Sequence, residues 1–276
     1  SGGDTGYASI WSHPVFRSLA PLAFFLYGGM IAVQTLWAGP WLVKVCGHTP
    51  ERAAAGLFTI NVAMLLTFLG WGAVVPRLYR SGWPAVRLLR WGVPACLALL
   101  ATALVLGEQA TAPWWALFCM SCSVVSLSQP AVGQALPATL AGRALSAYNL
   151  VIFAGIFALQ WGLGLAIDAL LALGWANVSA FRGALALWGL CALLAYVWFL
   201  RHSARVDAAP VIPAAPANDN SRSMPGLLII AHAPLASSLK SVASHAFPDC
   251  GARLEALDVR PDMTPEQIEA AAREML

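Results

Sequence analysis

The stretch ALSAYNLVIFAGIFALQWGLGLAI, residues 144–167, contains no Asp, Glu, Lys or Arg. A helix of about 20 apolar residues is long enough to cross the hydrocarbon core of a bilayer. Five further stretches have the same character and lie at about 19–43, 53–75, 88–106, 113–136 and 183–200. The sequence therefore predicts a polytopic, mainly α-helical membrane protein whose residues 1–205 form a six-helix transmembrane bundle.

The composition supports this class. Hydrophobic residues make up 59% of the chain and charged residues 11%, whereas a soluble domain carries about 25% charged residues. Twelve tryptophans fit the same class, because indole rings favour the membrane–water interface. The arginines are spread between apolar stretches and form no basic patch, so we expect the lipid bilayer, and not nucleic acid, as a partner.

The positive charges between the stretches predict an orientation. The side on which the chain starts receives eight arginines, whereas the other side receives Lys44, Arg52 and Arg182. Positive loops remain on the cytoplasmic side of a membrane, so we expect both termini to be cytoplasmic. The eight arginines are Arg17, Arg77, Arg80, Arg87, Arg90, Arg143, Arg201 and Arg205.

Polar and aromatic side chains recur at steps of three and four residues in three of the stretches, so each set is expected to share one helical face. Polar groups in a membrane are costly unless they face a cavity or another helix. They are therefore either solute-binding groups or hydrogen-bonding groups between helices. The candidate solute-binding residues are Tyr27, Gln34, Trp37 and Trp41 in the first stretch, Gln129 in the fourth, and Asn149 and Gln160 in the fifth. Asn61, in the second stretch, is a weaker candidate.

We expect the small residues in the stretches to serve helix packing, and not catalysis or metal binding. Cys119 and Cys122 have C-x-x-C spacing, but inside an apolar helix without a second pair they are packing residues. No charged residue lies in the middle of a stretch, and we expect neither a metal nor a cofactor. Glycines expected to allow close helix contacts are Gly70, Gly72, Gly155, Gly162 and Gly164.

The character of the sequence changes near residue 206. Residues 206–223 are rich in Pro and Ala and have no hydrophobic period, which is typical of an extended linker. In the remaining residues, 224–276, a short apolar run is suited to a buried parallel strand, with His232 in the turn after it and Pro234 as the first helical residue. A second strand and a helix that opens with the capping box Thr264–Gln267 follow. The order βαβα predicts a truncated α/β segment with a parallel sheet.

Three segments of the apolar part carry a family resemblance. The loop GAVVPRLYRSGWPAVR (72–87) resembles the cytoplasmic signature of major facilitator superfamily transporters. YGGMIAVQTLWAGPWL (27–42), followed later by SAYNLVIFAGIFALQWGLGLAID (146–168), resembles the carboxy-terminal halves of bacterial members. The resemblance implies half of a facilitator fold in a bacterial inner membrane, a further six-helix half before Ser1, and a small solute as substrate. It also implies that the first and fourth spans line the cavity, which favours Gln34 and Gln129 as solute-facing residues.

The tail carries a second resemblance. LLIIAHAPLASSL (227–239) and LDVRPDMTPEQI (257–268) resemble the opening part of the mannose-type enzyme IIA domain of the bacterial sugar phosphotransferase system. This resemblance implies that His232 is phosphorylated by the phosphocarrier protein HPr, with the helix after it donating amide N–H groups to the phosphate. The aspartate that orients the histidine in that family follows a third strand and would lie beyond residue 276.

Three functions therefore remain open from the sequence. The first is transport of a small solute by alternating access between two six-helix bundles. The alternative is a phosphoryl carrier that is tethered to the membrane by the apolar part. The third is that the apolar part is a passive anchor, for which the polar stripe at Tyr27, Gln34 and Trp41 would be unnecessary.

Overall fold

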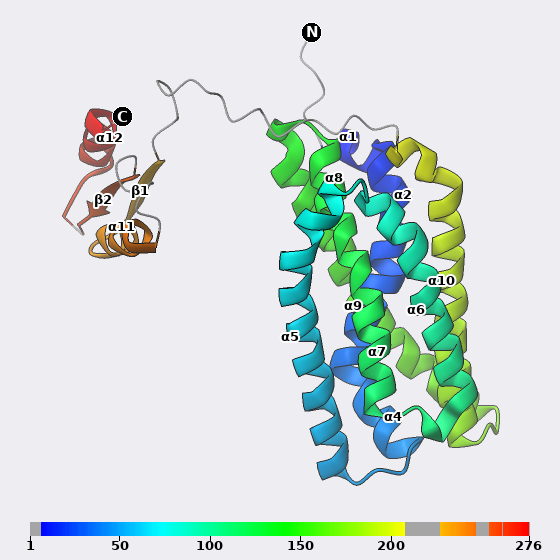
Figure 1. Cartoon of the computed structure of the whole chain (residues 1–276). Helices are drawn as coiled ribbons and strands as arrows, with labels where there is room; N and C mark the ends of the chain where they lie inside the picture. The colour runs from blue at the N-terminus through cyan, green and yellow to red at the C-terminus, as the bar shows by residue number, and fades with distance from the viewer. Residues whose placement is uncertain (1–6, 208–226, 247–253, 261, 276) are drawn as a thin grey trace. The chain divides into compact units, whose positions relative to one another are not determined.

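The computed structural model describes residues 7–207, 227–246, 254–260 and 262–275 (Figure 1). The chain divides into two compact units, Ser1–Ile212 and Pro213–Leu276. The first unit is a bundle of long helices, and the second contains a small parallel sheet with helices. The sequence predicted this succession of a mainly α-helical part and an α/β part.

Six helical spans among the described residues are long and apolar enough to cross a membrane, as the sequence predicted. Each is longer than its apolar stretch or coincides with it to within a residue, because the helices continue through the polar residues at the stretch ends. The six spans are Pro14–Lys44, Pro50–Arg80, Ala85–Gln109, Ala112–Ala135, Thr139–Ala172 and Asn177–Ser203.

Four of the spans are formed by one long helix each: α5 (Pro50–Arg80), α6 (Ala85–Leu106), α9 (Ala138–Ala172) and α10 (Asn177–Asp207). A short helix, α1 (Tyr7–Ser12), precedes the first span.

Local sequence fixes the ends of α5. The Thr49 hydroxyl accepts a hydrogen bond from the Arg52 N–H at the start of the helix, and Pro50 occupies its first position. Gly82 follows the helix with a φ of 81°, and the Trp83 N–H donates a hydrogen bond to the Leu78 carbonyl. This Schellman arrangement needs a residue that tolerates positive φ.

The first span is not a regular α-helix. It consists of α2 (Pro14–Leu22), α3 (Gly28–Ala32) and α4 (Ala38–Lys44), separated by π-helical turns at Ala23–Tyr27 and Val33–Trp37. Each wider turn changes the direction in which the following side chains point, so steps of three and four residues no longer mark a single face. The expectation that Tyr27, Gln34, Trp37 and Trp41 share one face is therefore wrong: Trp41 is buried, whereas Gln34 is only partly covered.

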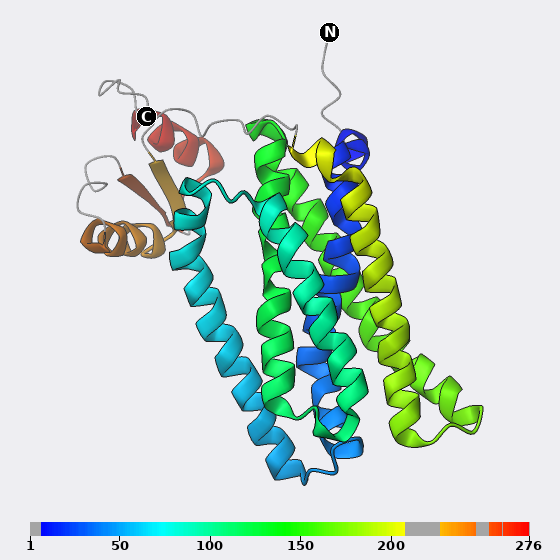
Figure 2. The same ribbon diagram turned by 45° about the vertical axis from the view of Figure 1, so that its right-hand side comes forward.

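The fourth span is also divided, into α7 (Ala112–Cys122), a 3-10 segment (Ser123–Leu127) and α8 (Ser128–Ala135). The first and fourth spans form the centre of the bundle. In the most apolar 18 residues of each span, 50% of the residues are buried in the first span and 56% in the fourth, but only 11% in α5. In the two views of Figures 1 and 2, α5 stands at the edge of the bundle.

Aromatic side chains pack through this centre. Trp41, Trp115, Phe118 and Trp188 form a chain of edge-to-face contacts, with ring centroids 5.3, 5.7 and 5.8 Å apart. Such contacts add about 0.5–1.5 kcal/mol each beyond area burial. They join the first, fourth and sixth spans.

Side chains from other helices also bond to the backbone of the first span. Trp188 Nε1 donates to the Phe25 carbonyl at 2.8 Å, and the Tyr148 hydroxyl donates to the Leu19 carbonyl at 3.1 Å. The Leu19 carbonyl also accepts the Ala23 N–H within the first span, so the bond from Tyr148 adds to the helical ladder and does not replace a lost bond.

The backbones of α3 and α9 approach each other closely. A Cβ atom added at Gly28 would lie 2.9 Å from the backbone of Gly155, and one added at Gly155 would collide with the Phe24 carbonyl. Gly155 thus has the packing role expected from the sequence. Gly70, Gly72 and Gly162 do not, because a Cβ at any of these positions would meet nothing within 4 Å.

We predict that Gly155→Ala destabilises the bundle by about 1–3 kcal/mol, because the added methyl group overpacks the crossing. Gly162→Ala on the same helix is the matched control and should change stability by less than about 1 kcal/mol. Reversible unfolding in mixed detergent–SDS micelles measures both. Equal effects of the two substitutions would contradict the crossing.

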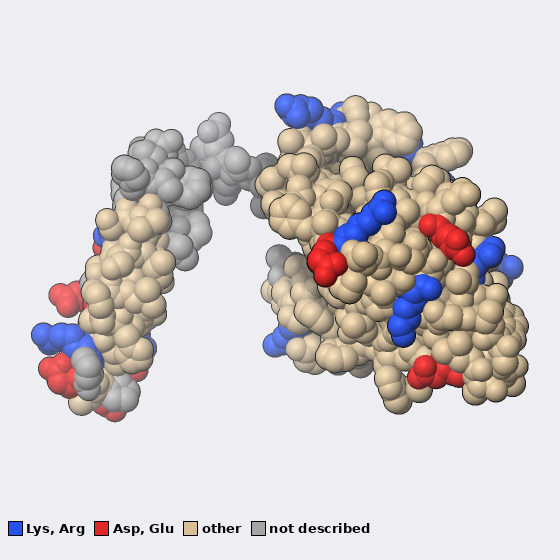
Figure 3. All heavy atoms as spheres, turned by 90° about the horizontal axis from the view of Figure 1, so that it is seen from below, with Lys and Arg blue, Asp and Glu red and all other residues tan. Residues whose placement is uncertain are grey.

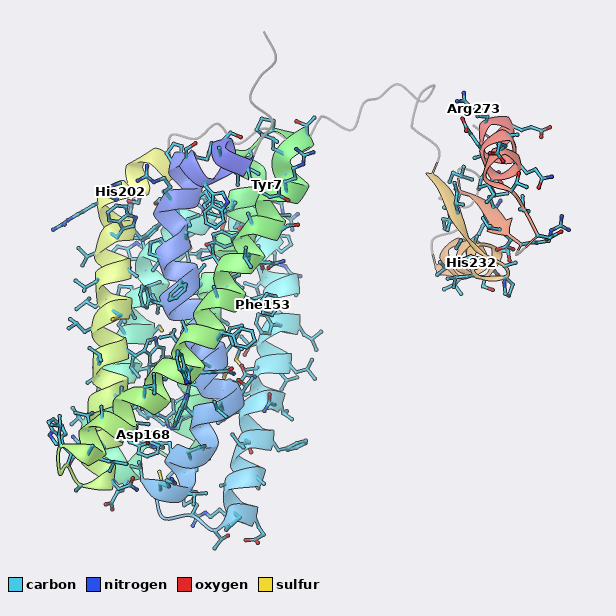
Figure 4. The ribbon with its side chains drawn as sticks, turned by 180° about the vertical axis from the view of Figure 1, so that it is seen from behind. Tyr7, Phe153, Asp168, His202, His232 and Arg273 are labelled. Carbon is cyan, nitrogen blue, oxygen red and sulfur yellow. The ribbon has the colours of Figure 1, made fainter. Side chains whose placement is uncertain are left out.

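The two ends of the bundle differ in charge. The end opposite the chain start carries three basic residues, Lys44, Arg52 and Arg182, and three acidic ones, Glu51, Glu108 and Asp168. Figure 3 shows that positive and negative side chains are interspersed there, and Figure 4 shows Asp168 at this end. All acidic residues between residues 7 and 203 belong to it, whereas the other end carries arginines.

The second unit has the predicted order βαβα. Strands β1 (Leu227–His232) and β2 (Leu254–Val259) are parallel, with His232 opposite Val259, and helices α11 (Leu235–Ala246) and α12 (Pro265–Met275) follow them. The capping box is confirmed, since the Thr264 N–H donates to Gln267 Oε1 at 2.9 Å and the Gln267 N–H to Thr264 Oγ1 at 3.4 Å. Two details differ from expectation: His232 ends the strand, and Pro234 precedes the first helical residue.

Candidate functional site

Amide side chains link the spans in pairs. Gln34 Nε2 of the first span donates to Asn61 Oδ1 of α5 at 3.0 Å. Gln160 Nε2 of α9 donates to Thr35 Oγ1 of the first span at 3.0 Å, and Gln129 of α8 donates to Asn149 of α9. Every amide predicted as a candidate is therefore held by a neighbouring helix.

These amides are confined to four of the six spans. Asn149 and Gln160 lie three helical turns apart on one side of α9, and their partners come from α8 and the first span. The remaining pair joins the first span to α5. The membrane-spanning parts of α6 and α10 contain no Asn or Gln, apart from Asn177 at the first residue of α10. We call the set Gln34, Thr35, Asn61, Gln129, Asn149 and Gln160 the amide face.

The amide face is accessible from outside the bundle. Asn61 and Asn149 are exposed, and Gln34, Gln129 and Gln160 are only partly buried. A carboxamide offers two N–H donors and an oxygen with two lone pairs, so one hydrogen bond leaves most of its capacity unused. These groups can bind a polar solute while the pairs keep them oriented.

The aromatic candidates have different environments. Trp37 Nε1 donates to the Gln160 carbonyl at 3.1 Å, which places it beside the amide face. Tyr27 is half-buried, and its hydroxyl has no hydrogen-bond partner among the described residues. Trp41 is completely buried and donates to the Ala110 carbonyl at 3.0 Å, so in this conformation it is a core residue without access to a solute.

Sequence reasoning undervalued Asn61 and missed Thr35. Asn61 could have been found from the composition, because amides are scarce in the spans and each tends to find a partner. Thr35 could not, because the spans contain many Ser and Thr residues. Which amide pairs with which, however, depends on the neighbours of each helix. The π-helical turn at Val33–Trp37 contains both Gln34, which points to α5, and Thr35, which points to α9.

In the second unit, His232 is exposed at the carboxyl end of β1, where open parallel sheets bind ligands. The adjacent N-terminus of α11 is already occupied: the Ser237 N–H donates to Asp258 Oδ1 at 3.1 Å. Asp258 belongs to β2 and lies one residue before the partner of His232. The Ser237 N–H is therefore bonded to Asp258 in this conformation, and donation from the α11 N-terminus to a phosphate stays a prediction. The side chain of His245 lies outside the described residues.

Asp258 is held in its ionised form. Hydrogen bonds from Ser237, through its side chain and its backbone N–H, lower the pKa of Asp258 below its usual 3.8. A carboxyl group with a lowered pKa in the folded state stabilises that state above pH 3.8, and this stabilisation is lost as the pH falls through the lowered pKa.

We predict that the Ser237 amide resonance titrates with an apparent pKa below 3.8, because it reports protonation of Asp258. A pH series of ¹H–¹⁵N spectra measures this. Asp258→Asn should abolish the titration at Ser237. A midpoint at or above 3.8 would show that the cap is absent.

Comparison with known proteins gives no assignment: the chain matches no family model, no curated protein and no solved structure. Among the described residues, no group of three or more His, Cys, Asp or Glu side chains could hold a metal ion. The candidate sites are therefore the amide face in the bundle and His232 in the second unit.

Proposed function

We propose that the bundle is the second half of a facilitator-type permease, which moves a small polar solute by alternating access. The amide face carries this proposal. In the permease it would face the first six-helix half across the solute pathway. The resemblance of residues 27–42 and 72–87 to facilitators supports the same arrangement.

The free-energy cost of exposing polar side chains to lipid favours a permease over a passive anchor. Asparagine and glutamine side chains in contact with lipid are unfavourable unless a protein or a water-filled cavity covers them. Here five amides are concentrated on the first, second, fourth and fifth spans. A passive anchor would have no need for such a face.

The charge distribution supports the orientation of the permease. The end where the chain starts carries Arg77, Arg80 and Arg87 in one connection and Arg143 in another, and every acid between residues 7 and 203 lies at the opposite end. By the positive-inside rule, the arginine-rich end faces the cytoplasm, in a bacterial inner membrane if the facilitator resemblance holds.

We predict that Gln34→Ala and Gln129→Ala each lower transport about tenfold, as expected for loss of one solute hydrogen bond. The amount of folded protein should fall less than twofold, because an interhelical hydrogen bond contributes only about 0.6 kcal/mol. The measurement is uptake of a labelled solute pool by liposomes that contain the full gene product.

Thr102→Ala is the matched control, since Thr102 lies exposed on α6 and bonds only to the Ala98 carbonyl of its own helix. It should leave both uptake and folded protein unchanged. Losses of transport that merely follow losses of folded protein would assign the amides to helix packing. Absence of uptake for every solute would contradict the permease.

The exposed position of His232 at the end of β1 favours a second candidate, a phosphoryl carrier of the sugar phosphotransferase system. A neutral imidazole nitrogen there can attack the phosphoryl group of phosphorylated HPr. Asp258 would have to leave the α11 N-terminus, because its carboxylate and the incoming phosphate have the same charge.

We predict that phosphorylated HPr transfers an acid-labile, base-stable phosphate to His232 in the full gene product. His232→Ala should abolish this transfer and His245→Ala should retain it. Radiolabelled phosphate followed by peptide mapping measures the site. Phosphorylation that persists in His232→Ala would refute the phosphoryl-carrier function.

A further inference from the structure

Two adjoining hollows on the surface of the bundle share one residue, Arg17. The first is a polar pocket of about 240 Å³ between α2 and the end of α10, lined by Ser12, Arg17, Ser18, Trp198 and His202 among others. The second is an apolar groove of about 560 Å³, which runs along α2 and is lined mainly by Trp11, Phe16, Ala20, Pro21, Phe24 and Phe25.

The polar pocket contains donors without partners. Arg17 has no hydrogen bond or ion pair to its guanidinium among the described residues. Ser18 is 1% exposed, and its Oγ lacks a hydrogen-bond partner within the described part of the chain. Buried hydroxyls are normally bonded, so this orphan points to a group that enters the pocket.

His202 is fixed beside these donors. Its Nδ1 lies 2.8 Å from the Trp198 carbonyl, and its ring lies against the Trp198 ring with centroids 4.1 Å apart. A carbonyl oxygen can only accept, so Nδ1 carries the proton of this bond, and Nε2 donates to an anion when the ring is an imidazolium. Trp198 in turn donates from Nε1 to the Arg17 carbonyl at 3.0 Å, which ties α10 to α2 at this point. Figure 4 shows His202 at the same end of the bundle as Tyr7.

The groove continues from Arg17 toward the middle of the bundle. Arg17, Ala20 and Pro21 of α2 and Phe24 of the π-helical turn after it follow one another at helical steps, over a rise of about 10 Å. The charged end lies at the start of the first span and the apolar end lies deeper within it. A phospholipid has the same order along the membrane normal, with a phosphodiester at the interface and acyl chains beneath it.

The charge of this end selects the kind of lipid. It carries arginines at residues 17, 77, 80, 87, 90, 143 and 201, whereas Asp207 at the end of α10 is the one acid there between residues 7 and 207. Anionic lipids concentrate in the cytoplasmic leaflet and attract basic residues near the surface.

We propose that this site binds one anionic phospholipid. Its phosphodiester occupies the pocket between Arg17, Ser18 and His202, and one acyl chain lies in the groove along α2. The proposal rests on the membrane location of the bundle, but not on transport, so a protein that fails to transport any solute can still bind the lipid.

Native mass spectrometry of the whole chain in detergent, titrated with phosphatidylglycerol or phosphatidylcholine, tests the site. We expect phosphatidylglycerol to bind more tightly, and Arg17→Gln to weaken it about five- to tenfold. Arg17→Lys should retain most of the preference. Ala20→Phe, which fills the groove, should weaken both lipids.

Arg80→Gln is the matched control, because it removes the same charge from the same end outside both hollows. It should leave the affinity for phosphatidylglycerol within twofold. Equal binding of the two lipids would overturn the proposal, as would equal losses in Arg17→Gln and Arg80→Gln, which would indicate general charge attraction. Each variant must keep the circular dichroism spectrum of the parent; if Arg17→Gln does not, Arg17→Lys and Ala20→Phe decide the outcome. A chain that remains soluble without detergent would contradict the membrane location itself, and with it the permease.

Discussion

The bundle depends on how the backbone of its first span is satisfied. In a membrane no water reaches the backbone, so a carbonyl freed from the helical ladder must find a donor inside the protein. Trp198 supplies such a donor to the Arg17 carbonyl, because Pro21, four residues further on, has no N–H to offer. Trp188 and Tyr148 donate to two further carbonyls of the same span, those of Phe25 and Leu19. These bonds draw α9 and α10 onto the first span and make it the axis of the bundle. The Gly28–Gly155 crossing then follows, because only small residues permit so close an approach.

The same irregular span accounts for the dual nature of the amides. The π-helical turn at Val33–Trp37 directs Gln34 to α5 and Thr35 to α9, so neighbouring residues of one helix bond to two different helices. Each amide is held by one hydrogen bond and keeps further donors and acceptors unused. Interhelical bonding and solute binding are therefore compatible functions of one side chain, and the first orients the groups needed for the second.

The six spans and the βαβα order could be predicted because they depend on local properties: the length of apolar runs, turn residues and the Thr264–Gln267 capping box. The face on which a side chain lies could not be predicted in the first span, because helical periodicity assumes a regular helix. Trp41 consequently became a core residue, although its spacing matched that of Gln34. The partners of Gln34, Gly155 and Asp258 come from residues at least 21 positions away, so only the tertiary arrangement determines them.

Asp258 places a specific constraint on the chemistry of His232. A carboxylate at a helix N-terminus is favourable because it accepts N–H bonds and meets the positive end of the helix dipole. A phosphoryl group on His232 would seek the same donors and would bring a charge of the same sign. Both anions cannot use the Ser237 N–H together, so phosphorylation must displace Asp258 or protonate it. If His232 carries phosphate, its phosphorylation is therefore coupled to a change in hydrogen bonding at the N-terminus of α11. The competing group is the Asp258 carboxylate on β2, the strand that pairs with the strand of His232.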